Sequence, residues 1–447
     1  MPSKRKDQIR LGAFLSGAGS HLAGWRHPDT QLDAAFDIQH YVRYAQTLEQ
    51  AGFDALFLND NFELGSLAPE LLARNTHTSR WDPLTVLPAL AMVTRHIGLI
   101  GTVNTTYNEP FNVARRFASL DHLSQGRAGW NVVTALGGGE NFNLDQHLPH
   151  DARYARAEEF VDVVTGLWDS WDDTAFIRQQ DSGLWLDPQK LHVLNHQGQH
   201  FSVRGPLNVP RTPQGWPVIA QAGSSGVGMQ LAARTAELVF TAQQELADAQ
   251  AFYQSIKQQA AHFGREHNEL LIMPGLATVV GRSREEAEAK YQQIQQNLDP
   301  VVIFQGILSY LNLGIKLDQL DLDQPVQLSD SIRLTESHQS RQALILKWIT
   351  THQPTYRQLL HHLGSGGHRT LVGTASDIVD ELELWFEQYA ADGFMIMFTH
   401  LPTALDDFVQ LVIPELQRRG LFRTEYIGQT LREHLGLAFK PNRYFQA

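Results

Sequence analysis

Short apolar runs alternate regularly with amphipathic helical stretches along almost the whole chain. The runs carry too few polar residues for a sheet with one solvated face, so we expect parallel strands that are buried on both faces. The predicted strands lie at residues 9–15, 53–58, 97–101, 127–133, 218–221, 238–241, 271–280 and 393–398. The predicted helices lie at residues 37–51, 83–94, 112–123, 152–168, 226–235, 246–263, 375–390 and 405–418, and Ser283 is placed as the N-cap of a further helix. Eight successive strands with helices between them predict an α/β fold that closes into a (β/α)8 barrel.

A doubly wound open sheet is the alternative architecture. A sheet of that kind that binds a dinucleotide usually has a glycine-rich fingerprint between its first strand and its first helix. Here Gly17 and Gly19 follow the first predicted strand, but the third glycine is missing and no helical pattern comes directly afterwards. The barrel is therefore the favoured prediction.

Composition excludes several classes of protein. The 447 residues include 48 acidic and 36 basic side chains and no cysteine, which gives a formal net charge of −12. We therefore expect no nucleic-acid partner, and disulfides, thiolate nucleophiles and cysteine-ligated metals are excluded. No apolar stretch approaches the roughly 18 residues that a membrane span needs. The apolar residues 11–15 fit a first strand better than a secretory peptide, and we expect a cytoplasmic protein with no membrane partner.

Three segments exceed ordinary loop lengths, at residues 61–81, 171–216 and 297–369. We expect one barrel domain over residues 1–447 that carries these segments as insertions. Insertions of this length usually act as lids or small subdomains.

The loops at the carboxyl ends of barrel strands usually carry the functional residues. In this chain these positions are polar and rich in small residues. Gly223, Ser224 and Ser225 lead directly into a predicted helix, where backbone N–H groups and hydroxyls could bind a phosphate. Alternatively, one of the two serines only caps that helix.

His150 and Tyr154 lie four residues apart at the start of another predicted helix. This spacing places the imidazole and the phenol on one helix face, where both could bind a phosphate or the edge of a flavin. A solvated helix start would show the same spacing, so both interpretations stay open.

Other chemistries find little support. The chain has 20 histidines, but H-x-x-E-H and H-E-x-x-H do not occur, and the adjacent pair His361 and His362 is poorly spaced for chelation. We therefore expect no catalytic metal. A serine hydrolase is not expected either, because G-x-S-x-G is absent.

Several motifs together carry a family resemblance. They are GAFL at 12–15, SH at 20–21, WRHP at 25–28, AGFD at 51–54, LND at 58–60, TTYNEP at 105–110, RRFASLD at 115–121, GRAGWNVVT at 126–134, RY at 153–154, QAGSS at 221–225 and LVGT at 371–374. From about residue 10 to about residue 437, the chain resembles the nitrilotriacetate monooxygenase group of the bacterial luciferase-like, FMN-dependent monooxygenases. The segment 297–369 is its least recognisable part.

The resemblance implies a TIM barrel that receives reduced FMN from a separate NAD(P)H-dependent flavin reductase. Reduced FMN and dioxygen would form a flavin C4a-(hydro)peroxide, which oxygenates carbon, nitrogen or sulfur in a small organic substrate and often leads to C–N or C–S cleavage. The resemblance also implies a homo-oligomer.

The resemblance further implies roles for individual residues. The flavin-binding residues would be Asp60, Thr106, His150, Tyr154 and Ser225, with Ser224 as a neighbour. His150, Tyr154 and Ser225 would hold the phosphate, and Asp60 and Thr106 would lie nearer the isoalloxazine ring. Asp60 could instead orient backbone N–H groups of its own loop.

His21 is the candidate catalytic residue, because an imidazole that titrates near neutrality could stabilise the peroxide or move a proton. The chain departs from the family pattern here, with Ser20 before His21 where two histidines are common. Ala135 and Asn143 are two smaller departures, at positions where serine and glycine are common.

Two alternative functions remain. One is a deazaflavin-dependent oxidoreductase of the same superfamily, which transfers hydride, and the other is a flavin-binding protein without turnover. The substrate is not predicted. Arg80, Arg204, Arg211 and Arg369 lie in or near the insertions and could pair with a substrate carboxylate, although surface arginines are the simpler interpretation.

Overall fold

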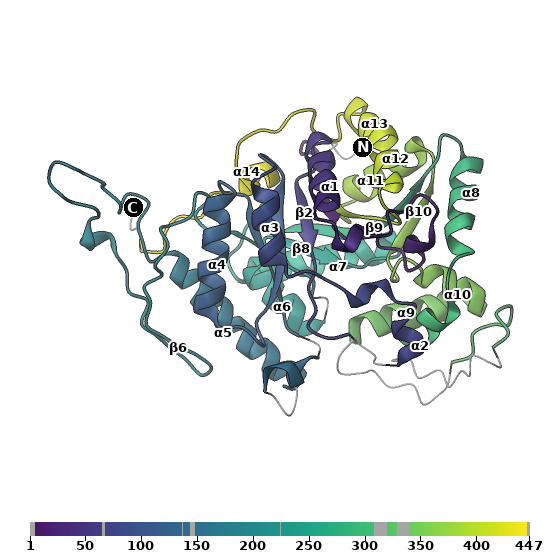
Figure 1. Cartoon of the computed structure of the whole chain (residues 1–447), viewed down its shortest axis with the longest axis horizontal. Coiled ribbons are helices and arrows are strands. Elements are labelled where there is room, and N and C mark those ends of the chain that lie inside the picture. The colour runs from purple at the N-terminus through teal and green to yellow at the C-terminus, as the bar shows by residue number, and fades with distance from the viewer. Residues whose placement is uncertain are drawn as a thin grey trace.

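Eight parallel strands close into a barrel, as the sequence predicts (Figure 1). The computed structural model describes residues 5–64, 68–135, 137–143, 148–223, 225–307, 320–328 and 339–444. The barrel strands are β1 (Arg10–Phe14), β2 (Ala55–Leu58), β3 (Gly98–Asn104), β4 (Ala128–Val133), β7 (Val218–Gln221), β8 (Leu238–Thr241), β9 (Leu271–Val280) and β11 (Gly393–Phe398). Each strand pairs with the next in this order, and β11 pairs with β1 to complete the ring.

One strand of the same sheet was not predicted. β10 (Arg369–Gly373) pairs in parallel with residues Leu276 to Val280 of β9. The first half of β9 pairs with β8, and its second half pairs with β11. The other edge of this second half is not used by β8, and β10 pairs with it. The predicted insertion 297–369 therefore ends inside a strand.

Helices surround the strands. They are α1 (Ile38–Gln50), α3 (Pro83–Ala91), α4 (Pro110–Leu123), α5 (His150–Trp168), α6 (Gly226–Thr235), α7 (Leu246–His262), α8 (Arg284–Gln295), α11 (Ala375–Glu387), α12 (Thr403–Asp407) and α13 (Ile413–Arg418). The predicted N-cap Ser283 is confirmed, because its side chain accepts from the backbone N–H of Glu286 at 3.2 Å. The predicted helix at 405–418 is interrupted, since a π-helical turn at Phe408–Val412 separates α12 from α13.

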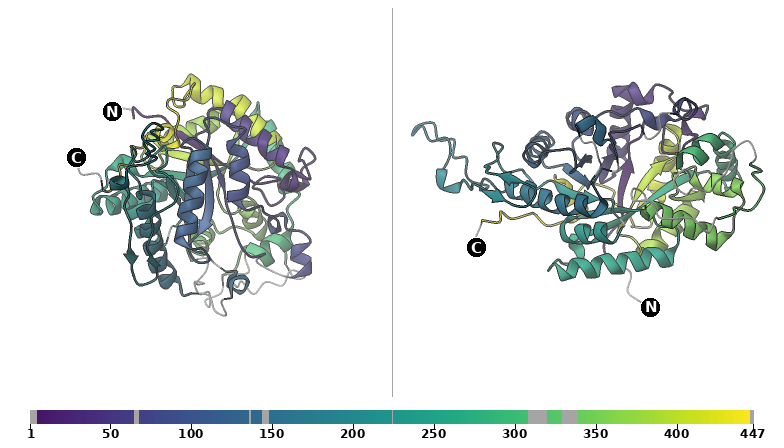
Figure 2. Two further views of the ribbon diagram at one scale, coloured as in Figure 1. Left: turned by 60° about the vertical axis from the view of Figure 1, so that its left-hand side comes forward. Right: turned by 90° about the horizontal axis from the view of Figure 1, so that it is seen from below.

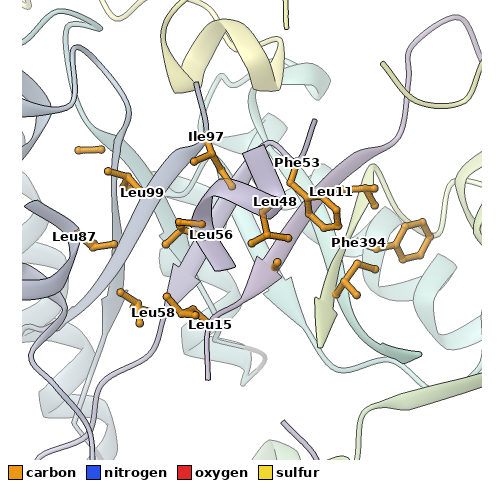
Figure 3. Close-up of a cluster of buried hydrophobic side chains, with 14 of the residues drawn as sticks. Leu11, Leu15, Leu48, Phe53, Leu56, Leu58, Leu87, Ile97, Leu99 and Phe394 are labelled. Atoms are coloured by element: carbon orange, nitrogen blue, oxygen red, sulfur yellow. The ribbon is translucent and has the colours of Figure 1, made fainter. Parts of the chain in front are cut away.

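The main hydrophobic core lies between the strands and the helices. Leu48 of α1 packs there with Leu11 and Leu56 from the first two strands (Figure 3). A second apolar cluster fills the barrel interior, and Leu431 of α14 (Leu431–Leu435) closes the end where the strands begin. The strand alternation that sends Leu11 and Leu56 outward turns their neighbours into the barrel.

Three phenylalanines form a layer inside the barrel near the carboxyl ends of the strands. The ring of Phe14 lies 4.9 Å from the ring of Phe57 and 5.3 Å from the ring of Phe240, measured between centroids. Phe57 is buried, whereas Phe14 and Phe240 are partly exposed. This layer forms an apolar floor for the mouth of the barrel.

The three predicted insertions carry their own short elements. α2 (Pro69–Leu72) lies in the first, and the loops around β5 (His196–Gln197) and β6 (Ser202–Val203) in the second extend away from the barrel (Figures 1 and 2). The third contains α9 (Gln339–His352) and α10 (Tyr356–Leu363), which share a separate apolar cluster with Ala23 from the loop after β1. In the described part of the chain, no helix is long and apolar enough to cross a membrane.

Candidate active site

The start of α6 and the start of α5 meet at the mouth of the barrel. α6 follows β7, α5 follows β4, and the two helices are in contact. Ser225 is the N-cap of α6, and its hydroxyl accepts from the backbone N–H of Gly228 at 3.2 Å. Of the two candidate serines, Ser225 is therefore the cap, and Ser224 lies outside the described residues.

A glycine allows two hydroxyl groups to lie close to the helix backbone at this point. A Cβ placed on Gly228 would lie 3.0 Å from Ser225 Oγ and 3.0 Å from Tyr154 Oη. Two hydroxyls and the first turn of a ten-residue helix therefore meet at Gly228. Hydroxyl donors, backbone N–H groups and the positive end of the helix dipole all favour a phosphate.

His150 is the first residue of α5 and lies against Tyr154, as their spacing predicts. The two ring centroids are 4.8 Å apart, and the rings are inclined by 50°. His150 Nδ1 is 3.0 Å from Asp151 Oδ1. This contact favours the tautomer with a proton on Nδ1, so the phenol and the imidazole form one polar surface beside Gly228.

Thr106 lies in the loop after β3 and is buried. Its hydroxyl accepts from the backbone N–H of Ala135 at 3.1 Å, which ties the carboxyl ends of β3 and β4 together. The carbonyl of Ala135 in turn accepts from the guanidinium of Arg153 on α5. Thr106 and the start of α5 are thus linked through the same loop.

Asp60 is half-buried two residues after β2. Its Oδ1 accepts from the backbone N–H of Asn61 at 2.9 Å, so the carboxylate does orient its own loop. Burial raises the pKa of Asp60, with a further contribution from Asp82 that the nearby Arg80 partly offsets. Asp60 therefore combines a structural contact with a position at the mouth.

His21 lies in the loop after β1 and is only 2% exposed. Its Nδ1 accepts from the backbone N–H of Ala23 at 3.1 Å, and its Nε2 faces Gly364, where a Cβ would lie only 2.4 Å away. Burial, together with His400 and His361, lowers the pKa of His21 to about 3. The expectation of titration near neutrality is therefore wrong: this imidazole is neutral at physiological pH.

Two buried polar atoms without a hydrogen-bond partner among the described residues lie on the neighbouring strands β4 and β7. Asn131 on β4 donates through Nδ2 to Thr102 Oγ1 at 2.9 Å, but its Oδ1 has no hydrogen-bond partner among the described residues. The same is true of Gln221 Oε1 at the end of β7. Because buried polar atoms are nearly always paired in folded proteins, these atoms fit a site for a polar ligand. Together with the two hydroxyls beside Gly228 at the start of α6, they fit a flavin mononucleotide.

The four candidate arginines divide into two groups. Arg80 and Arg204 are exposed, in agreement with the simpler interpretation. Arg211 is instead buried and pairs with the buried Asp169, and Arg369 pairs with Glu381 at 2.5 Å. These two arginines are already neutralised within the fold, so neither a surface role nor a substrate carboxylate accounts for them.

Sequence reasoning did not assign two residues at the mouth. His368 precedes β10 and lies beside Gly275 of β9, and Arg341 of α9 contacts His368. Both residues come from the third insertion, far in the sequence from the strand-end motifs, so no motif indicated them. The described residues contain no group of three or more histidines, aspartates or glutamates that could hold a metal ion.

Comparisons with known proteins agree with this geometry. The family described as luciferase-like monooxygenase matches residues 18–392. The chain is 49% identical to N-acetyl-S-(2-succino)cysteine monooxygenase from Bacillus subtilis (strain 168), over 99% of this chain and 100% of that protein. It is 47% identical to nitrilotriacetate monooxygenase component A from Aminobacter aminovorans, over 97% of this chain and 98% of that protein.

Two solved structures extend the comparison. EDTA monooxygenase from Chelativorans sp. BNC1 has a TM-score of 0.82 at 31% identity, covering 98% of this chain and 100% of that chain. Riboflavin lyase, solved with modified FMN and riboflavin, has a TM-score of 0.83 at 31% identity, with 96% of each chain covered. The fold, the site and these similarities lead to one conclusion: the chain belongs to the luciferase-like monooxygenase family, in the group that includes nitrilotriacetate monooxygenase component A.

Proposed function

We propose that this protein is the oxygenase component of a two-component flavin system. It takes reduced FMN from a separate NAD(P)H-dependent reductase and uses dioxygen to oxygenate a small organic acid at nitrogen, at sulfur or at the carbon beside it. The name of its relative from Aminobacter aminovorans, nitrilotriacetate monooxygenase component A, supports a system with a second protein.

The observation that carries the proposal is the position of Tyr154 Oη and Ser225 Oγ, each 3.0 Å from a Cβ on Gly228. A phosphate in front of Gly228 would accept hydrogen bonds from both hydroxyls and from the N–H groups of α6. His150 adds an imidazole beside Tyr154, and its Nε2 would donate to the phosphate when both ring nitrogens carry protons. Reduced FMN, once bound, supplies the electrons that activate dioxygen.

The remaining residues have supporting roles in this proposal. Thr106 and Asp60 border the mouth on the β2 and β3 side, where the isoalloxazine ring would lie. Phe14 and Phe240 offer it an apolar floor and keep water out of the barrel interior. His21 stays neutral and is suited to donating or accepting a hydrogen bond rather than to carrying charge.

Chemistry shared by two relatives supports the substrate class. Nitrilotriacetate and N-acetyl-S-(2-succino)cysteine both carry several carboxylates next to a tertiary amine or a thioether. We therefore expect a small polycarboxylate whose nitrogen or sulfur, or the carbon beside it, is the atom oxygenated.

Anaerobic titration of the purified protein tests the cofactor. Reduced FMN, oxidised FMN and a reduced deazaflavin are compared, and tight binding of reduced FMN alone is expected. Preference for the deazaflavin would replace oxygenation by hydride transfer. Aerobic incubation with a flavin reductase, NADH, catalase and the two polycarboxylates then tests turnover, and binding without oxygen-dependent product would identify a flavin-binding protein instead.

A further inference from the structure

The second insertion projects from the barrel as an arm, a name we give to residues 171–194. The arm follows α5 and leads to β5, and it reaches beyond the helices that surround the strands (Figures 1 and 2). All of its residues are described, and Ala175 is the only buried one among them. Because an arm with almost no buried side chains gains little from its own packing, little offsets the entropy of fixing its backbone. The arm therefore needs a surface outside itself to hold its conformation.

The outer end of the arm is a short hairpin over residues 176–186. The backbone N–H of Arg178 donates to the carbonyl of Trp185 at 3.0 Å, and the N–H of Gln179 donates to the carbonyl of Leu184 at 2.8 Å. A two-stranded hairpin alone is marginally stable in water. Packing of its side chains against another surface would therefore fix this hairpin.

The side chains of the hairpin are apolar and open to solvent. Ile177 is 45% exposed, Leu184 is 50% exposed and Trp185 is 62% exposed. Arg178 and Asp181 are the only charged residues between positions 176 and 186, so the hairpin carries no net charge. Exposed aromatic and aliphatic side chains without net charge are typical of the centre of a protein–protein interface.

Aromatic rings continue from the hairpin to the base of the arm. The ring of Phe176 lies 6.3 Å from the ring of Trp185 and 4.9 Å from the ring of Trp171, measured between centroids. At the base, the partly exposed Tyr444 stacks on His192 with the centroids 4.3 Å apart. Taking about 200 Å² for a whole aromatic side chain, the exposed parts of Trp185 and Tyr444 amount to roughly 200 Å². Two side chains thus supply about a quarter of the surface that each partner contributes to a stable interface.

The chemistry of the hairpin indicates a permanent partner. A protein that binds and dissociates with each turnover would return Leu184 and Trp185 to water each time, and permanent interfaces are the more hydrophobic class. A second copy of this chain is always present at an equal concentration. In a two-fold contact both copies bury an arm at once, so the same hairpin contributes twice. Without net charge, two such surfaces also approach each other without repulsion.

We propose that the arm is a contact between two copies of this chain, and that Trp185 is the anchor that packs into the second copy. The arm begins just after α5, which has 19 residues, so its base lies about 27 Å along the helix axis from His150. Substitutions in the arm therefore leave the proposed flavin-binding residues of the same protomer in place. Assembly and flavin binding can thus be measured separately.

Sedimentation velocity of the full-length protein, at concentrations from nanomolar to micromolar, tests the contact. The variants are Trp185→Asp and Leu184→Asp, which place a charge on the exposed hairpin. Ile427→Asp is the control, because Ile427 is 81% exposed in the loop between α13 and α14 and lies outside the arm. Anaerobic titration with reduced FMN checks that the barrel of each variant is folded.

The wild-type protein is expected to form a dimer or a larger even-numbered assembly. Trp185→Asp should raise the dissociation constant about 100-fold or more, because an aromatic anchor is lost from both sides of the contact. The particle mass in the micromolar range should then fall by half or more. Leu184→Asp should act in the same direction, and Ile427→Asp should match the wild type. The affinity for reduced FMN should stay unchanged in all three variants.

The absence of cysteine from the chain allows a second measurement on nearly native protein. Leu184→Cys and Ile427→Cys each introduce the single thiol of the molecule. At micromolar concentration, the thiol of Leu184→Cys should react with a maleimide about tenfold or more slowly than the thiol of Ile427→Cys, because it reacts only when the contact opens. After dilution to the monomer, the two thiols should react at similar rates.

Three results would overturn the proposal. The first is a monomer at every concentration with two equally reactive thiols, which would leave the arm to a different protein. The second is an assembly that Trp185→Asp leaves intact, and the third is equal disruption by Ile427→Asp. None of these readouts depends on dioxygen or on a substrate, so each outcome is independent of the function proposed above.

Discussion

The hydroxyls of Tyr154 and Ser225, which are 71 positions apart in the sequence, both lie beside the same glycine, Gly228. Each would be 3.0 Å from a Cβ on Gly228. One hydroxyl belongs to the first turn of α5 and the other to the N-cap of α6. Only a residue without a side chain lets both hydroxyls lie this close to the start of α6, where both could donate to the same phosphate.

Gly228→Ala should therefore weaken binding of reduced FMN by about tenfold or more, because the methyl group would press against both hydroxyls and displace them from the positions that a phosphate needs. The higher helix propensity of alanine, about 1 kcal/mol, works against the cost of this crowding, which includes Gly223 Cα at 3.2 Å from the new Cβ. Gly226→Ala is the matched control, because a Cβ there meets no heavy atom of the described residues within 4 Å. Anaerobic flavin titration and thermal unfolding of both variants check this prediction, which fails if the two bind FMN equally.

Ser225→Asp separates capping from binding. Aspartate caps helices as well as serine does, so the free energy of unfolding should change by less than about 0.5 kcal/mol. Its carboxylate would face the phosphate and should lower the affinity for reduced FMN by more than about tenfold. Ser225→Ala should instead lose about 1 kcal/mol of stability with the cap. Unchanged flavin affinity in Ser225→Asp would remove Ser225 from the site.

Acid should destabilise the fold through its buried histidines. Burial lowers the pKa of His21, His368 and His400 from 6.5 to about 3. The unfolded chain takes up protons below pH 6.5 and the folded chain does not, so stability is full above pH 6.5 and falls as the pH decreases towards 3. Each histidine should contribute roughly 1 kcal/mol for each pH unit in that window.

Urea unfolding of the wild type and of His400→Gln between about pH 7.5 and about pH 5 measures this effect. The variant should show a shallower loss of stability on acidification, whatever its stability at neutral pH. Parallel pH profiles for the two proteins would show that His400 is not held neutral by the fold.

Arg211 and Asp169 form a buried ion pair on which the second insertion depends. Asp169 is fully buried, and its Oδ1 also accepts from Trp216 Nε1 at 2.7 Å. Arg211→Met should cost about 3–5 kcal/mol of unfolding free energy, because it leaves a buried carboxylate with fewer partners. Arg204→Met, at an exposed arginine of the same insertion, should change stability by less than about 0.5 kcal/mol. Denaturant unfolding of both variants makes the comparison, and equal losses would contradict it.

The sequence by itself determined most elements of the fold, including every strand of the barrel. Strand and helix periodicity reflect local burial, and all eight predicted barrel strands are present, from β1 (Arg10–Phe14) to β11 (Gly393–Phe398). Local signals also placed the helix that begins at Gly226 and the contact between His150 and Tyr154. These features depend on residues within a few positions of one another, so the pattern of side chains along the chain is enough to predict them.

Tertiary structure alone decided what these elements do together. β10 exists because β9 extends past the barrel wall, and Arg211 is buried because Asp169 lies beside it. The pKa of His21 is lowered because the side chain is buried, in part against Gly364, which lies 343 positions further along the chain. Burial, pairing and dielectric environment are set by neighbours from distant segments, and no spacing in the sequence reports which segments those will be.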